Sequence, residues 1–372
     1  ESVTSAATAA VTNLNDVPTG SVTISGTVTE DQTLTASNSL ADNDGLGVIT
    51  YQWQRDGVDI DSATNSTYTL GDSDVGAVIT VVASYTDSQG TAESVTSSAT
   101  AAVTNINDTP TGSVTISGTA TEDQTLTASN SLADADGLGS ISYQWQRDGV
   151  DIGSATNATY TLGDSDVGAV ITVVASYTDS QGTAESVTSS ATTAVTNIND
   201  TPTGSVTISG TVTEDQTLTA SNSLADNDGL GVITYQWQRD GVDISSATNA
   251  TYTLGDADVG AVMTVVASYT DGQGTAESVT SSATAAVTNL NDAPTGSVTI
   301  SGTVTEDQTL TASNTLADDD GLGSISYQWQ RDGVDIGSAT NATYTLGDSD
   351  VGAVMTVVAS YTDGQGTAES VT

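Results

Sequence analysis

Carboxylate side chains are the residues of this sequence whose number and placement could support chemistry. The 372 residues include 47 Asp and Glu against 4 Lys and Arg, all of them Arg, and there is no Cys or His. Thiol or imidazole catalysis, Schiff-base lysines and Cys/His zinc sites are therefore excluded. What remains is acid–base work by paired carboxylates, as in glycoside hydrolysis, or binding of a hard cation through oxygen ligands.

These acids recur at a fixed period. Trp53, Trp145, Trp237 and Trp329 stand 92 residues apart, so the chain contains four copies of one unit. Residues 19–110 and 111–202 differ at seven positions. Interchangeable copies suit a spacer, whereas an enzyme needs one distinctive active site, so we expect no catalysis. The net charge of −43 argues against a nucleic-acid partner. The sequence has no long apolar run, so we expect no membrane span.

The elements that must position the acids are predicted to be strands. In the first copy, β-branched or alternating runs cover 21–25, 32–37, 49–55, 67–70, 77–86 and 92–103, separated by Gly, Asp and Asn clusters. No segment has a helical period. About seven short strands in 92 residues predict an all-β fold with two packed sheets per copy.

One stretch of the first copy indicates which kind of two-sheet fold to expect. It reads Tyr51-Gln-Trp-Gln-Arg-Asp-Gly57, followed by Thr67-Tyr-Thr-Leu70 and Asp72-Ser-Asp-Val-Gly76. This resembles an immunoglobulin-like domain, in which a Trp on the third strand fills the core. The Cys pair and the corner tyrosine of that family are missing. The resemblance implies four tandem immunoglobulin-like β-sandwich domains in a linear, extended array.

The hairpin at 77–103 sets the phase of the repeat, because its turn at 87–90 separates the last two strands. The predicted organisation is one linker-plus-strand segment followed by four units: residues 1–18 (last strand of a preceding unit plus linker), 19–110, 111–202, 203–294 and 295–372, the fourth unit lacking most of its last strand. Residues 1–12 are then an orphan strand, for which we expect head-to-tail addition to another chain.

Strand directions predict where the acids meet. Loops carrying Glu30 and Asp72 fall at the end of the unit where its linker leaves. The next unit approaches with two loops, which carry Asp134, Asp136 and Asp179. Two carboxylates a few ångströms apart repel by roughly 1–4 kcal/mol at surface-like dielectric. A divalent cation removes that conflict, and Ca²⁺ accepts six to eight such oxygens. The alternative is that Asp-x-Asp-Gly is ordinary turn chemistry.

A second resemblance supplies a ligand set. Residues 13–18 and the Asp-Ala-Asp loop at 134–136 look like the cadherin interdomain linker and its partner loop, which hold calcium between domains. Asn105 stands where that family has its first linker Asp. Carried over, the resemblance implies calcium at three junctions: Glu30, Asp72, Asp74, Asn105, Asn107, Asp108, Asp134 and Asp136; Glu122, Asp164, Asp166, Asn197, Asn199, Asp200, Asp226 and Asp228; Glu214, Asp256, Asp258, Asn289, Asn291, Asp292, Asp318 and Asp320.

Three competing interpretations concern other residues. Trp53 could stack on a sugar, but one Trp per copy on a strand is expected to be core. Arg55 is expected to form an exposed ion pair of little energetic consequence. Asp42 and Asp44 could act as a glycosidase pair, yet they share one loop with no cleft predicted around it. A repeated carbohydrate-binding or homophilic adhesion module remains the alternative function.

Four short sequence runs of the repeat carry a third resemblance. The runs 20–26, 40–47, 51–54 and 84–87 look like the tandem bacterial immunoglobulin-like repeats of very large RTX biofilm adhesins. The resemblance covers the whole chain. It implies a calcium-stiffened extender at the surface of a Gram-negative bacterium, secreted by a type I system and anchored in the outer membrane through another region. Its partners would be neighbouring repeats of the same chain.

Overall fold

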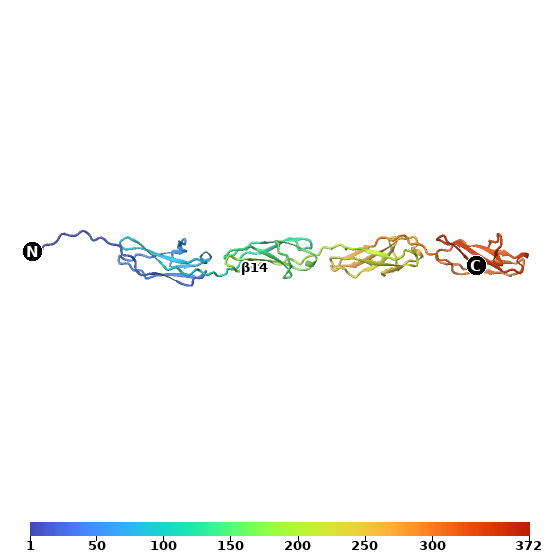
Figure 1. The fold of residues 1–372 in the computed structure, drawn as a ribbon, viewed down its shortest axis with the longest axis horizontal. Helices are drawn as coiled ribbons and strands as arrows, with labels where there is room; N and C mark the ends of the chain where they lie inside the picture. The colour runs from blue at the N-terminus through green and yellow to red at the C-terminus, as the bar shows by residue number, and fades with distance from the viewer. The chain divides into compact units, whose positions relative to one another are not determined.

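The computed structural model describes all 372 residues, and its regular elements are almost entirely strands. The chain divides into two compact units, residues 1–198 and 199–372. Residues 1–17 precede the first sheet and form no strand (Figure 1). The only helical elements are three-residue 3₁₀ turns, and none could cross a membrane. The all-β expectation is confirmed, whereas the domain boundaries drawn from the sequence stay a prediction.

The first copy of the repeat builds two antiparallel sheets that face each other across one core. A three-stranded sheet has the order β1-β2-β5, and a four-stranded sheet has the order β4-β3-β6-β7. The elements are β1 (Val22–Ser25), β2 (Thr33–Asn38), β3 (Thr50–Arg55), β4 (Val58–Asp59), β5 (Thr67–Thr69), η1 (Asp72–Asp74), β6 (Ile79–Thr86) and β7 (Ala92–Thr96). Sequence neighbours β2 and β3 lie in different sheets, as in an immunoglobulin-like sandwich.

The other three copies repeat this order. The second contains β8 (Val114–Ser117), β9 (Thr125–Asn130), β10 (Ser142–Arg147), β11 (Val150–Asp151), β12 (Thr159–Thr161), η2 (Asp164–Asp166), β13 (Ile171–Thr178) and β14 (Ala184–Thr188). The third contains β15 (Val206–Ser209), β16 (Thr217–Asn222), β17 (Thr234–Arg239), β18 (Val242–Asp243), β19 (Thr251–Thr253), η3 (Asp256–Asp258), β20 (Met263–Thr270) and β21 (Ala276–Thr280). The fourth contains β22 (Val298–Ser301), β23 (Thr309–Asn314), β24 (Ser326–Arg331), β25 (Val334–Asp335), β26 (Thr343–Thr345), η4 (Asp348–Asp350), β27 (Met355–Thr362) and β28 (Ala368–Val371).

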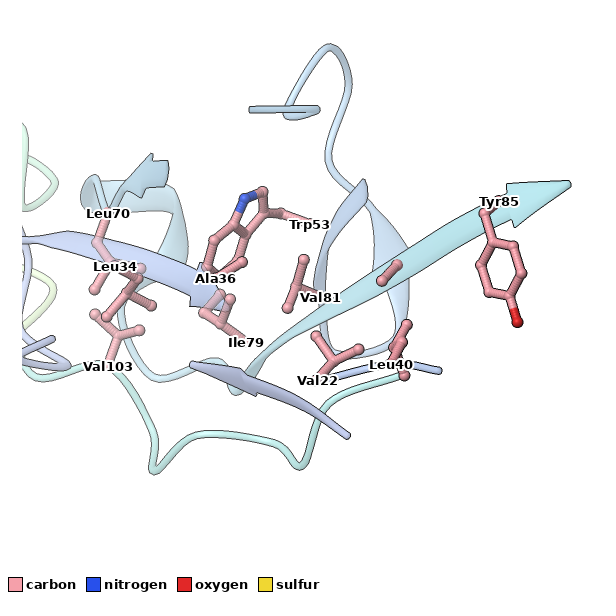
Figure 2. Packing of buried hydrophobic residues seen from close by; sticks show 11 residues of the cluster. Val22, Leu34, Ala36, Leu40, Trp53, Leu70, Ile79, Val81, Tyr85 and Val103 are labelled. Carbon is pink, nitrogen blue, oxygen red and sulfur yellow. The ribbon is translucent and has the colours of Figure 1, made fainter. Parts of the chain in front are cut away.

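The core forms because alternate residues of each strand face inward. Along β6, every second side chain from Ile79 to Tyr85 is buried. Trp53 of β3 is fully buried, and its indole N–H donates to the Asn65 carbonyl oxygen at 2.9 Å. Figure 2 shows this ring in the middle of the cluster, with Tyr85 at one end. The core assignment of Trp53 is confirmed, so the ring is not available to stack on a sugar.

The expected strand at 92–103 is wrong in its second half, because β7 ends at Thr96. Beyond that point two hydroxyls replace backbone acceptors: the Val81 N–H donates to Ser97 Oγ, and the Ile79 N–H donates to Thr100 Oγ1, both at 3.0 Å. The segment 97–104 therefore leaves the regular ladder while still lying along β6. It then reaches the other sheet, where Val103 is buried in the core.

Candidate metal centre

Three carboxylates converge at the end of the first repeat. Glu30 follows β1, Asp72 begins η1, and Asp108 lies in the segment after the last core residue. One oxygen from each lies within 4.8 Å of the others, and Glu30 is only 1% exposed. The chain therefore gathers negative charge from three separate segments around a buried acid.

Glu30 is fixed by the segment that leaves the repeat. Its backbone N–H donates to the Thr104 carbonyl oxygen at 3.0 Å, and its Oε2 accepts the Ile106 N–H at 3.1 Å. Its Oε1 is buried without a hydrogen-bond partner, as is the Oδ1 of Asn105. Leaving a buried acceptor unsatisfied costs about 1–3 kcal/mol, more when the group is charged. Both oxygens are of the kind that Ca²⁺ binds.

The pKa values of the acids at this end of the repeat reflect their burial and their closeness to one another. Burial raises the pKa of Glu30, and Asp72 and Asp136 raise it further, against the lowering effect of the Ile106 N–H. Burial also raises the pKa of Asp108, together with Asp136 and Asp72. Negative charge is therefore disfavoured here unless a cation compensates for it.

The second repeat contributes Asp136 to the same region. This side chain is 5% exposed, and its Oδ2 accepts the Asp108 N–H at 2.8 Å. The Asp136 N–H donates to Asp134 Oδ1 at 2.9 Å, and Gly137, with φ of +94°, completes the turn in a conformation that favours glycine. The amide of Asn107 donates to Glu185 Oε1 at 2.7 Å. The linker is thus hydrogen-bonded to the repeat that follows it.

The ligand set inferred from the sequence omits one further acid. Asp179, in the turn after β13, accepts the Gln181 and Thr183 N–H groups on Oδ1, while its buried Oδ2 has no partner. Strand directions in the sequence place its turn at the same end of the repeat as Asp134 and Asp136, although the cadherin-like ligand set does not include it. Its burial makes it a further candidate. Asp134 is engaged differently, since its Oδ2 accepts the hydroxyl of Tyr177.

The end of the third repeat has the same construction. One oxygen each of Glu214, Asp256 and Asp292 lies within 4.8 Å of the others. Glu214 Oε2 accepts the Leu290 N–H at 3.2 Å, while Glu214 Oε1 and Asn289 Oδ1 are buried without partners. Burial, Asp256 and Asp320 raise the pKa of Glu214 to about 7. The bonds from the linker to the next repeat also recur: Asn291 to Glu369, and Asp292 to Asp320, whose loop neighbour Asp318 accepts the Tyr361 hydroxyl.

In the segment that follows the second repeat, each compact unit contains hydrogen bonds equivalent to those of Glu30 and Asp136. Glu122 Oε2 accepts the Ile198 N–H at 3.0 Å in the first unit. Asp228 Oδ2 accepts the Asp200 N–H at 2.8 Å in the second unit. The calcium ligands expected at this position stay a prediction, namely Glu122, Asp164, Asp166, Asn197, Asn199, Asp200, Asp226 and Asp228.

Asp74 lies apart from the carboxylates that converge. Its Oδ1 accepts the Arg55 guanidinium at 2.7 Å, and its Oδ2 accepts the Tyr68 hydroxyl at 2.8 Å and the Gly71 N–H at 3.0 Å. Asp74 is 1% exposed, so Arg55 does not form the fully exposed pair expected from the sequence. The 3₁₀ turn directs this acid inward, which the spacing Asp-x-Asp alone did not reveal. Asp166 and Asp258 have the same Arg and Tyr partners in their repeats.

Comparison with known proteins gives the following. No protein-family model matches the sequence, and no curated protein matches it. Among solved structures, a Ca²⁺-stabilized adhesin that helps an Antarctic bacterium reach out and bind ice is 14% identical, with 96% of this chain and 98% of that chain covered and a TM-score of 0.35. A tetra-tandem repeat in the extending region of a large adhesion protein is 19% identical over 95% and 98% of the two chains, with a TM-score of 0.31. An ICAM-5 D1–D4 ectodomain fragment reaches a similar TM-score of 0.32 at 13% identity over 95% and 98%. Such low TM-scores carry no argument about function.

Proposed function

We propose that this chain is an extender segment of a large bacterial cell-surface adhesin, in which Ca²⁺ at the junctions between repeats stiffens the array. The observation that carries the proposal is the buried, unpartnered Oε1 of Glu30, which lies among the carboxylates of Asp72 and Asp108. Its equivalent at Glu214 has the same surroundings. A cation bound at this position would give the oxygen the partner that it lacks and would favour its ionised form.

The donor set fits a hard cation. Glu30, Asp72, Asn105, Asp108 and Asp136 would hold the ion at the first junction, and all of them offer oxygen. No His or Cys is present, so metals that prefer nitrogen or sulfur have no ligand to bind. Ca²⁺ accepts more oxygens and a looser geometry than Mg²⁺, which suits a site assembled from several loops.

The mechanical consequence follows from where the ligands lie. Glu30 and Asp72 belong to one repeat, Asn105 and Asp108 to the linker, and Asp136 to the next repeat. An ion bound to all three parts restrains the linker against both repeats. When the ion is removed, like charges remain at the junction and favour separation. Calcium would therefore set the stiffness of the array.

A repeated, calcium-stiffened spacer suits an extracellular role, because calcium there reaches the 10⁻⁴–10⁻³ M range that extracellular modules bind. On the adhesin resemblance, we place the segment outside a Gram-negative cell, secreted by a type I system and anchored through another region. It would project a distal adhesive domain, and it would carry no enzymatic activity.

Isothermal titration with Ca²⁺ tests this proposal. The wild-type chain should bind ions with affinity in the range of extracellular modules, and Glu30→Gln combined with Glu214→Gln should lower the number of sites. Glu306→Gln is the matched control, because Glu306 occupies the same sequence position in the fourth repeat but is exposed. No calcium binding by the wild type, or equal loss in the control, would contradict the proposal.

A further inference from the structure

Each repeat carries the tripeptide Asn-x-Thr in the loop that leads into the last strand of its three-stranded sheet. The four copies begin at Asn65, Asn157, Asn249 and Asn341. This tripeptide is the acceptor sequence of N-linked glycosylation, in which a sugar is attached to the asparagine amide. The first copy ends at Thr67, the first residue of β5. None of the candidate calcium ligands belongs to these loops, so the proposed function leaves the tripeptides without a role.

The two side chains that define the motif are free in the first repeat. Asn65 and Thr67 are exposed, and neither side chain makes a hydrogen bond within the chain. Tyr68 points the other way, since successive residues of a strand face opposite sides, and its ring stacks on that of Trp53 with 5.8 Å between the centroids. The equivalent Asn and Thr residues of the other three repeats are exposed as well. An enzyme can therefore contact both side chains without unpacking the core.

The backbone of the same loop is held in place. The Asn65 carbonyl oxygen accepts the indole N–H of Trp53 at 2.9 Å, and the Ser66 carbonyl oxygen accepts the Ala36 N–H at 2.8 Å. Both bonds recur in the other three repeats. The loop thus combines a fixed backbone with free side chains, so a transferase that binds it has few additional groups to order.

The strand that follows Asn65 lies at the edge of its sheet. The strand order is β1-β2-β5, so β5 pairs with β2 on one side and has no strand partner on the other. The equivalent strands β12, β19 and β26 are also edge strands. An enzyme can approach the tripeptide from this open side. Such edges also favour pairing between chains, and this sequence has no Lys with which to discourage it.

Two further Asn-x-Thr tripeptides, in the segments after the first and second repeats, differ from these loops. They begin at Asn107 and Asn199. The amide nitrogen of Asn107 donates to Glu185 Oε1 at 2.7 Å and to the Asp108 carbonyl oxygen at 3.2 Å. Asn199 donates in the same way to Glu277 Oε1, at 2.8 Å. The motif is the same, but in these segments the nitrogen that would accept the sugar is already engaged.

We propose that Asn65, Asn157, Asn249 and Asn341 are acceptor sites for N-linked glycosylation of the folded chain, by a transferase that uses a sugar diphosphate as donor. The asparagine Nδ2 forms a bond to the anomeric carbon of the sugar. The bond between that carbon and the diphosphate oxygen breaks, and the diphosphate leaves with the electron pair. A base of the transferase takes one amide proton. Each attached sugar is a bulky polar group beside an open strand edge, where it hinders edge-to-edge pairing between chains.

Incubation of the folded 372-residue chain with UDP-glucose and a soluble N-glycosyltransferase that recognises Asn-x-Ser/Thr tests the proposal. Intact mass and peptide mapping should locate one hexose at each of the four loop asparagines and none at Asn107 or Asn199. Thr67→Val should reduce modification of Asn65 at least about tenfold, because the motif requires the hydroxyl residue. The other three loops of the same chain then serve as internal references.

Ser66→Ala is the matched control. It removes a hydroxyl one residue earlier and produces the tripeptide that the other three repeats already have, so Asn65 should be modified as in wild type. Loop asparagines that stay unmodified in the folded chain would overturn the proposal, as would equal modification of Asn107 or equal losses in Ser66→Ala and Thr67→Val. The reaction should give the same occupancy in chelator and in Ca²⁺, so its outcome is independent of calcium binding.

Discussion

The first and fourth repeats share one loop sequence but differ in what surrounds it. Glu30 and Glu306 both lie in the run Thr-Glu-Asp-Gln, yet Glu30 is 1% exposed and Glu306 is exposed. The first repeat has one continuous core cluster, whereas the core of the fourth is split in two. The segment 97–108 accounts for the difference, because it covers Glu30 and fills the core beside it. The candidate metal centre is thus a property of a junction and not of a repeat.

The largest effect expected from this difference is on stability. Residues 97–104 bring a buried valine and six backbone hydrogen bonds to the first repeat, and their equivalents are missing from the part of the fourth repeat that this chain contains. At roughly 1 kcal/mol per bond and about 2 kcal/mol for the side chain, the difference is about 8 kcal/mol. Each repeat has one buried Trp, so urea unfolding followed by Trp fluorescence should show about a quarter of the amplitude at lower urea.

Val103→Asp is the matched variant for this experiment. It should move a second quarter of the fluorescence amplitude to low urea, because it places a charge in the core of the first repeat. A single symmetrical transition in the parent chain, at the same midpoint for all four Trp residues, would show that the last segment contributes little.

Calcium should widen the difference between the repeats. An ion at about 20 times its dissociation constant stabilises the folded state by roughly 1.8 kcal/mol, since it binds only that state. For repeats of this size that is a rise in melting temperature of about 7–14 °C. Differential scanning calorimetry in chelator and in Ca²⁺ should show the shift for the repeats with complete junctions, with Mg²⁺ as control. A uniform shift that includes the fourth repeat would argue for unspecific charge screening.

The variant Glu30→Gln tests the contribution of a single carboxylate to the candidate metal centre of the first repeat. The variant removes a buried negative charge, so in chelator the first repeat should become slightly more stable than wild type. In Ca²⁺ the order should reverse, with affinity at that junction reduced about tenfold, or 1.4 kcal/mol. Glu306→Gln should change neither quantity. Equal behaviour of the two variants by calorimetry would remove Glu30 from the ligand set.

A further effect concerns pH. Burial and two neighbouring acids raise the pKa of Glu214 to about 7, so between its unfolded pKa of 4.5 and 7 the folded state holds the extra proton. In chelator, the contribution of Glu214 to the stability of the third repeat should therefore be greatest below pH 4.5. It should fall as the pH rises to 7. Calcium should abolish the fall because it favours the carboxylate. Melting temperatures that rise over this window in chelator would contradict the assignment.

Strand alternation made much of the fold predictable. The spacing of Ile79, Val81, Ala83 and Tyr85 indicated one buried face, and the structure buries all four. The end of β7 at Thr96 was not predictable, because hydroxyls of Ser97 and Thr100 replace backbone acceptors without changing the residue pattern. In the candidate site, loop order brought Glu30 and Asp72 together correctly. The inward turn of Asp74 and the unsatisfied oxygen of Asp179 depend on local backbone geometry, which residue spacing does not encode.

Small-angle X-ray scattering of the 372-residue chain in chelator, in Mg²⁺ and in millimolar Ca²⁺ tests the central claim most directly. We expect the maximum dimension to increase and the profile to become rod-like only in Ca²⁺, because bound ions restrain the linkers between repeats. Three coincident profiles would contradict the account, and the acidic junctions would then be hydrated turns with no mechanical role.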